Sequence, residues 1–194
     1  MNRQLSFAQY RAIDLAIWAG ILAVVQWVIQ TAATVWFPRE LYVVSPVAAI
    51  VAIVMMRWGP WAILHAALGG VVFALSAGGN GQHFLIFALG NMASLAALLI
   101  LLPGKEKVRE NSFLSLMFAL AVQLSMLLGR AAMALLLGAS LQEALGFITT
   151  DILSVLFTLV VIWIARRADG LFEDQKHYLL RLERERQQRR ERSA

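Results

Sequence analysis

Hydrophobic residues run through most of this chain in long stretches, and polar residues gather at the breaks between them. Most stretches approach the roughly 20 apolar residues that one helix needs to cross a bilayer. Proline, glycine and charged pairs stand between them, as is typical of helix ends. The pattern predicts an all-α integral membrane protein, a bundle of six transmembrane helices over about Ala12–Trp36, Leu41–Met56, Trp61–Ala77, His83–Leu102, Phe113–Leu137 and Phe147–Ala165.

The second predicted helix, Leu41–Met56, is short for a full crossing. Five crossings with a re-entrant second helix are therefore the alternative to six. With six crossings we expect a cytoplasmic N-terminal segment over residues 1–11, a transmembrane domain over 12–165 and a charged cytoplasmic helix or tail over 166–194.

Composition supports this assignment, because 60% of the residues are hydrophobic and only 15% are charged. Soluble domains usually have about 25% charged residues. Lys and Arg lie in the segments that alternate helices place on one side, whereas Arg39 is the lone basic residue in the loops of the other side. The positive-inside rule then puts both termini in the cytoplasm of a bacterial inner membrane. The net charge of +5 follows from this topology and does not indicate nucleic-acid binding.

Several kinds of chemistry are missing from the sequence. The chain has no cysteine, which excludes disulfides, thiolate metal sites and thiol catalysis. It has no GxxxxGK[ST] phosphate loop and no His-Glu-x-x-His zinc motif. We expect no catalytic residues, no metal ligands and no cofactor.

The tail from Arg166 is rich in charge and in helix-forming residues. Leu171, Phe172, Leu179 and Leu182 would fall near one face of a helix. One interpretation is a solvated helix that continues the last transmembrane helix. The other is a helix that docks on a partner or on an anionic lipid surface.

Polar side chains inside the predicted helices concentrate in the half of the membrane that faces outward. Ionisable groups in a span are costly, so each is a candidate functional residue. The pattern indicates a substrate cavity open to the outside. Its candidate substrate-binding residues are Arg130, Asn91, Gln123, Asp151, Gln26 and Gln30.

Arg130 is the most informative of these residues, and its role has three interpretations. Its guanidinium could bind a carboxylate or phosphate through two parallel hydrogen bonds. It could instead form a structural ion pair with Asp151 on the next helix. A third possibility is that the side chain extends to the outer headgroups.

Small residues recur at spacings of three and four along the first half of the first helix. Such stripes allow close helix–helix approach in membranes. The stripe is either packed within the bundle or forms a docking face for another membrane protein. Its members are Ala12, Ala16, Ala19, Gly20 and Ala23.

The architecture and the Ala12-xxx-Ala16 and Ala19-xxx-Ala23 spacings resemble the S component, the substrate-binding membrane subunit, of energy-coupling-factor (ECF) vitamin transporters. The resemblance covers roughly Ala12 to Ala165. It implies a protein that captures a small micronutrient from outside, which would be anionic if Arg130 binds it. It also implies a transmembrane coupling subunit that contacts the first helix and is driven by separate ATPase subunits.

Two other classes fit the sequence less well. Small bacterial cell-shape scaffolds of the MreD type have a similar size and need no ligand. A lipid-alcohol phosphotransferase would need several Asp residues near Asp169-Gly170, and these are missing. The sequence therefore favours a transport subunit, with a non-catalytic scaffold as the alternative.

Overall fold

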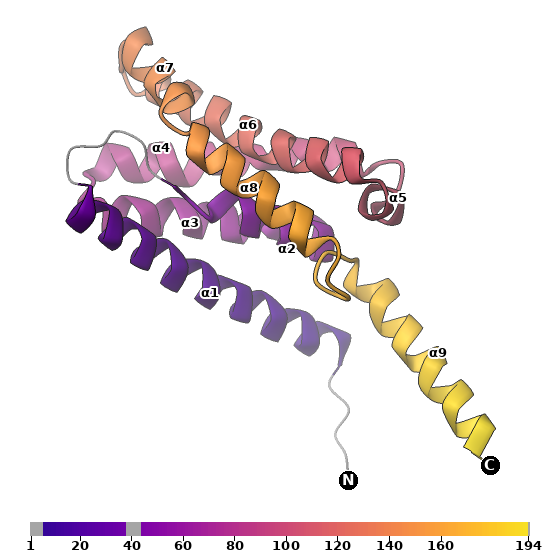
Figure 1. Ribbon diagram of the computed structural model, residues 1–194. Helices are drawn as coiled ribbons and strands as arrows, with labels where there is room; N and C mark the ends of the chain where they lie inside the picture. Colours follow the sequence, from indigo (N-terminus) through magenta and orange to yellow (C-terminus); the bar gives the residue numbers. More distant parts are fainter. Residues whose placement is uncertain (1–5, 38–43, 194) are drawn as a thin grey trace.

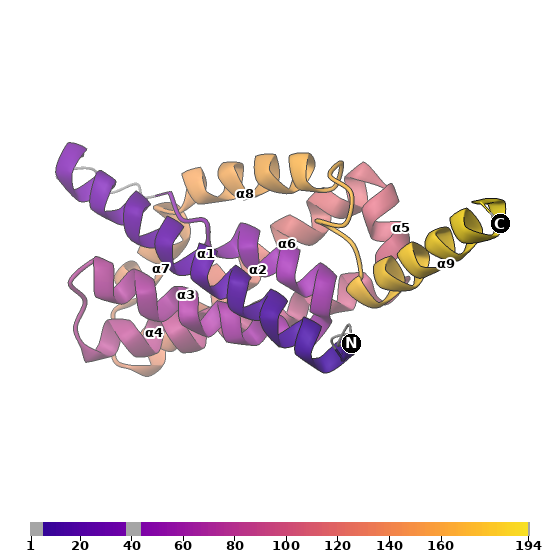
Figure 2. The same cartoon turned by 90° about the horizontal axis from the view of Figure 1, so that it is seen from below.

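The computed structural model describes residues 6–37 and 44–193, which are mostly helical and include no strand. The helices pack side by side into a bundle, except α9, which extends away from it (Figures 1 and 2). In chain order they are α1 (Phe7–Trp36), α2 (Val47–Trp58), η1 (Gly59–Trp61), α3 (Ala62–Ser76), α4 (Gly81–Met92), η2 (Ala93–Leu101), α5 (Lys105–Glu110), α6 (Ser112–Leu136), α7 (Leu141–Thr149), α8 (Ile152–Ala165) and α9 (Gln175–Ser193).

The described part of the chain has the apolar helices of a multi-pass membrane protein. Apolar side chains on the outward faces of the bundle are exposed, among them Val24, Leu128 and Ile164. This arrangement is favourable only where the surroundings are also apolar, as in lipid. Five helical stretches are long and apolar enough to cross a membrane, namely Phe7–Trp36, Val47–Ser76, Gly81–Leu101, Ser112–Leu136 and Leu141–Ala165.

The stretch Val47–Ser76 is not one straight helix, because the chain reverses direction near its middle. Gly59 has φ of 61°, a left-handed conformation that glycine adopts without steric cost. A Cβ built on Gly69 of α3 would lie 2.5 Å from the Val47 side chain at the start of α2. The two helices therefore pack antiparallel, as Figure 1 also shows.

Helix α2 forms the centre of the bundle, and all twelve of its residues are buried. It contacts α1, α3, α6 and α8. At 1.5 Å per residue it is about 18 Å long, well short of the roughly 30 Å hydrocarbon thickness. The predicted start of this helix at Leu41 lies outside the described residues, and its end is Trp58 rather than Met56.

Other helix boundaries differ from the predicted ones where polar residues cap helices. The first helix begins at Phe7, not Ala12, because Ser6 and Gln9 form a capping box that satisfies free backbone N–H groups. Ser140 and Glu143 form another box that starts α7 within the predicted link Gly138–Gly146. The predicted last helix, Phe147–Ala165, is interrupted at Thr150 and Asp151, between α7 and α8.

Glycines set the closest approach between helices α4 and α6. A Cβ on Gly90 would lie 2.7 Å from the Arg130 Cα, and a Cβ on Gly129 would collide with the Gly90 carbonyl oxygen. Only glycine permits backbones to come this near, as at small-residue contacts in membranes. This contact brings residues 91 and 130 together.

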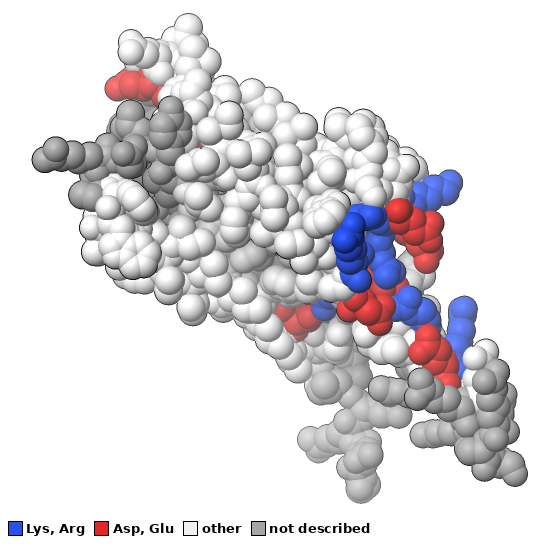
Figure 3. All heavy atoms as spheres, viewed as in Figure 1, with Lys and Arg blue, Asp and Glu red and all other residues white. Residues whose placement is uncertain are grey.

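One end of the bundle carries most of its charge and is called the basic end. It includes Arg57, Lys105, Arg109 and Arg166, and α9 leaves from it (Figure 1). On the face seen in Figure 3, the Lys and Arg side chains lie there, interspersed with acidic ones. The end with the loops over residues 77–80 and 137–140 is called the opposite end.

Arg57 ties three segments together at the basic end. Its Nε and Nη2 donate to the two carboxylate oxygens of Asp14 on α1, at 2.9 and 2.6 Å. Its Nη1 donates to the Gly170 carbonyl, and Trp58 Nε1 donates to Asp14 at 2.5 Å. The two-point Arg–carboxylate contact fixes the direction of both side chains.

The tail does not continue the last transmembrane helix, so that interpretation was wrong. Helix α8 ends at Ala165, and Gly170 at φ of 68° turns the chain before α9 begins. In this linker, residues 166–174, Phe172 is fully buried and its ring lies 6.2 Å from that of Phe118. Burial of a phenylalanine stabilises by about 1.5–3 kcal/mol, so the linker belongs to the core.

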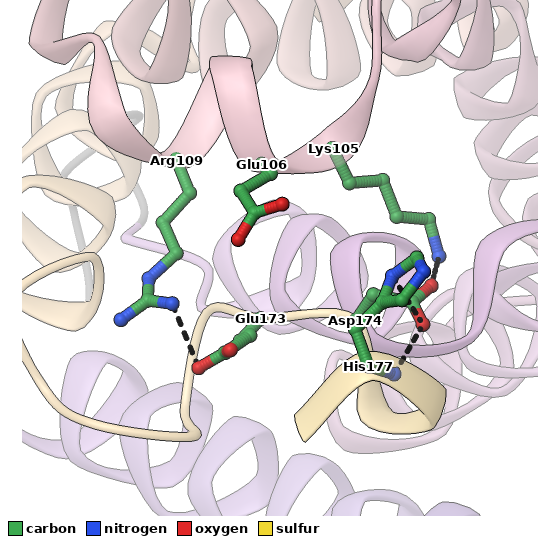
Figure 4. A pocket seen from close by; sticks show the side chains of 6 residues that line it. All are labelled: Lys105, Glu106, Arg109, Glu173, Asp174 and His177. Atoms are coloured by element: carbon green, nitrogen blue, oxygen red, sulfur yellow. Dashed lines mark hydrogen bonds and ion pairs between the residues drawn. The ribbon is translucent and has the colours of Figure 1, made fainter. Parts of the chain in front are cut away.

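Ion pairs hold the linker against α5 (Figure 4). Lys105 Nζ lies 2.5 Å from Asp174, and Arg109 Nη1 lies 2.8 Å from Glu173. Burial acts to raise the pKa of Asp174, but the hydrogen bonds and charges of Lys105 and His177 together outweigh it and keep this pKa below its usual value. The charged form of Asp174 therefore favours the folded linker, and this contribution is lost only as the pH falls through the lowered pKa.

We expect Gly129→Ala to lower the free energy of unfolding by about 1–3 kcal/mol, the usual cost of overpacking. The matched control is Gly146→Ala in α7, where a Cβ would meet nothing within 4 Å. This control should be neutral or stabilising by up to about 1 kcal/mol, because alanine favours helix. Unfolding in detergent with denaturant would measure both, and equal effects would contradict the proposed close contact.

Candidate functional site

The α4–α6 contact places Asn91 against Arg130 deep in the bundle. Arg130 Nε donates to Asn91 Oδ1 at 2.7 Å, and Asn91 Nδ2 donates to the Ala66 carbonyl at 3.1 Å. Arg130 is only 6% exposed and Asn91 is fully buried. The arginine therefore does not extend to the surface, which excludes the headgroup interpretation.

Asp151 lies at the break between α7 and α8 and forms an ion pair with Arg130. The Arg130 Nη1 to Asp151 Oδ2 distance is 2.9 Å. Gln123 Nε2 also donates to Oδ2 at 3.3 Å, and Ser154 Oγ donates to Oδ1 at 2.6 Å. The carboxylate is thus satisfied from α6 and α8, as a buried charge must be. Of the alternatives for Arg130, the structure shows the ion pair.

The polar network continues from Asp151 to the first helix. The Ser45 backbone N–H donates to Ser154 Oγ at 2.9 Å, and Ser45 Oγ donates to Gln26 Oε1 at 2.8 Å. Gln26 and Gln30 are both buried. Gln26 Nε2 and Gln30 Oε1 have no hydrogen-bond partner in the described part of the chain. Five of the six predicted site residues therefore share one network, and Gln30 lies outside it.

A cavity of about 140 Å³ lies beside the ion pair, toward the opposite end. It is lined by Ser45, Phe73, Phe87, Arg130, Phe147, Thr150 and Asp151. Arg130 donates from Nε to Asn91 and from Nη1 to Asp151, but its Nη2 N–H groups have no acceptor among the described residues. The cavity is therefore lined by a guanidinium with unused N–H donors beside a carboxylate.

Three phenylalanine rings form the apolar wall of this cavity. The Phe87 ring lies 4.4 Å from Phe73 and 5.6 Å from Phe147, the latter nearly edge-on at 74°. The Arg130 Cζ atom lies 5.1 Å from the centre of the Phe87 ring, within cation–π distance. A concave apolar wall with a few convergent polar groups is the usual form of a small-molecule site.

The sequence indicated the polar half of this site but not its wall. Asn91, Gln123, Arg130 and Asp151 were predicted together. Phenylalanines in a membrane segment give no signal of their own, because they equally fit lipid contact. Ser154 could have been inferred from its i,i+3 spacing to Asp151. The remaining residues absent from the predicted set are Ser45, Phe73, Phe87, Phe147, Thr150 and Thr158.

The small-residue stripe on α1 is divided by the structure. Ala12, Ala16 and Gly20 are exposed, whereas Ala19 and Ala23 are half-buried. A Cβ on Gly20 would meet nothing within 4 Å. The exposed members form a smooth face that no described segment of the chain covers.

Within the described residues, no group of three His, Asp or Glu side chains could hold a metal ion. No protein family, curated protein or solved structure matches the chain significantly. The site must therefore be interpreted from its own geometry.

We expect Arg130→Met and Asp151→Ala each to lower the free energy of unfolding by about 3–5 kcal/mol, because each leaves a buried charge unpaired. The double variant should lose much less than the sum of the two. Arg181→Met is the control, since its pair with Asp169 is exposed and its other partner, Glu173, keeps the pair with Arg109. The loss should be about 1 kcal/mol or less. Additive losses in denaturant melts would contradict a coupled pair.

Proposed function

We propose that this chain is the substrate-binding membrane subunit of an ECF-type importer in a bacterial inner membrane. It captures a small micronutrient from the outer face and docks on a transmembrane coupling subunit that separate ATPases drive. The observation that carries this proposal is the cavity lined by Arg130 and three phenylalanines, in which the guanidinium carbon lies 5.1 Å from the centre of the Phe87 ring. A scaffold would need neither a cavity nor a free buried donor.

The distribution of charge supports an orientation for this subunit. Arg57, Lys105 and Arg109 lie at the basic end with α9, which matches the cytoplasmic side of the positive-inside rule. Both termini are then cytoplasmic, and the cavity opens toward the outside. The chain then passes six times if α2 is counted as a partial crossing. A partial crossing is tolerated here because α2 is surrounded by protein, where helix ends need not face lipid.

The exposed face of α1 supports docking on a second membrane protein. Ala12, Ala16 and Gly20 present no bulky side chain there, so another helix could approach closely. Docking of a second membrane protein on this face would not break any contact that α1 makes in the described part of the chain. The resemblance to the S components of ECF transporters also implies a coupling subunit that contacts the first helix.

We expect a reporter inserted at Gly78 to be active outside the cell and one fused after residue 194 to be active in the cytoplasm. Gly78 lies in an open turn, where a Cβ would meet nothing within 4 Å, so an insertion should be tolerated. Paired phosphatase and fluorescent-protein fusions would measure both sites. Activity of both reporters on the same side would contradict the proposed orientation.

We expect Thr150→Phe to abolish solute binding, because the new ring would fill the cavity without removing a partner of the ion pair. Thr149→Phe is the matched control, since Thr149 is the exposed neighbour and does not line the cavity. Native mass spectrometry of gently purified protein would detect a bound solute in the wild type and in the control but not in Thr150→Phe. A wild-type protein without a bound solute, and with no affinity for a panel of metabolites, would contradict the proposal.

A non-catalytic membrane scaffold is the second candidate, and the tail favours it. The linker fixes the start of α9 through Phe172, Lys105 and Arg109. The helix then extends beyond the bundle (Figures 1 and 2), where a partner could reach it. For a scaffold, Thr150→Phe would leave activity in the cell unchanged, whereas truncation of α9 would remove it.

A further inference from the structure

We infer that the cavity accepts a planar, uncharged ring with a hydrogen-bond acceptor beside a donor, such as an amide or lactam edge, and discriminates against carboxylates. This inference rests on the proposed solute-binding function and concerns the same site. It differs from what Arg130 alone suggests, because an isolated guanidinium would favour an anion.

The charge of the site disfavours an anionic ligand. Arg130 and Asp151 form a close pair with side chains 7% and 13% exposed, so together they present no net charge to the cavity. A carboxylate placed at Arg130 Nη2 would also lie near the Asp151 carboxylate. Like charges at short range in a poorly hydrated site cost several kcal/mol, and an uncharged ligand avoids this cost.

The free donors and acceptors of the site also favour an uncharged ligand. Arg130 uses its Nε–H on Asn91 and one Nη1–H on Asp151, so both Nη2–H groups have no acceptor among the described residues. A carboxylate offers acceptors only, so it could use these donors but not the acceptors of the site. The Asp151 oxygens and Thr150 Oγ1, whose proton goes to the Gly146 carbonyl, are acceptors. A ligand that presents one acceptor and one adjacent donor would match this set.

The shape and size of the cavity favour a single planar ring. Its walls include Phe73, Phe87 and Phe147, and aromatic rings prefer stacked or edge-to-face neighbours. Its volume of about 140 Å³ is close to the roughly 150 Å³ of the engineered lysozyme cavity that binds benzene. The cavity therefore has about the size of one six-membered ring.

Benzamide and benzoate are matched probes for this inference, because they share one ring and differ in the charge of the substituent. We expect isothermal titration of the full chain in nanodiscs at neutral pH to show benzamide binding at least about tenfold tighter than benzoate. The lactam 2-pyridone should bind in the same range as benzamide. Benzoate binding as tightly as benzamide, or more tightly, would overturn the inference.

Asp151→Asn tests the cause of the preference. The amide keeps the size of the side chain and an acceptor for Arg130 but removes the negative charge, so benzoate should gain at least about tenfold relative to benzamide. Asp174→Asn is the matched control, because it removes the same charge at the basic end and should leave the preference unchanged. Equal preference in the wild type and Asp151→Asn would overturn the electrostatic argument, and if Asp151→Asn does not fold, the wild-type comparison decides.

The outcomes also separate this inference from the proposed function. If neither probe binds but native mass spectrometry detects another bound solute, the ligand class is wrong and the binding function remains. If only carboxylates bind, the ligand class is again wrong and the binding function again remains. If no probe binds and no solute is detected, both are wrong.

Discussion

The buried pair of Arg130 and Asp151 is the interaction on which the rest of this structure depends. An isolated charge in a membrane bundle is strongly unfavourable, so each partner must be met by the other and by further hydrogen bonds. Asn91, Gln123 and Ser154 supply those bonds from α4, α6 and α8. Because each of these side chains, the acceptor Asn91 and the donors Gln123 and Ser154, comes from a fixed helix, the pair determines the relative depth and rotation of three helices.

The two ends of the bundle use the same kinds of residue, but one end is packed and the other has a cavity. At the basic end, Arg57, Asp14 and Phe172 bring α1, α2 and the linker into one packed layer. At the opposite end, Arg130 and Asp151 are also paired, but the space beside them stays open. The result is a bundle that is packed at the basic end and has a cavity toward the opposite end, which is the arrangement that the proposed uptake function requires.

The proposed preference for an uncharged ligand follows from the pairing of Arg130 with Asp151, not from the presence of an arginine alone. Arginine beside phenylalanine suggests an anion site, yet the carboxylate of Asp151 already neutralises the guanidinium. What remains for a ligand is the unused N–H groups of Arg130, nearby acceptors and an aromatic wall. Selectivity would then arise as much from what the site repels as from what it binds.

The sequence by itself determined the helical, membrane-embedded character of this protein, because burial of apolar surface and satisfaction of backbone groups in lipid leave few alternatives. It also indicated Asn91, Gln123, Arg130 and Asp151, since polar groups in a span need a reason. It could not determine that Gly90 and Gly129 touch, that α2 turns back at Gly59, or that Phe172 returns to the core. Those features depend on contacts between residues far apart in the chain, and periodicity describes only one helix at a time. The partner of Arg130, and with it the net charge of the cavity, was decided by the tertiary structure alone, because only packing fixes which buried charges meet.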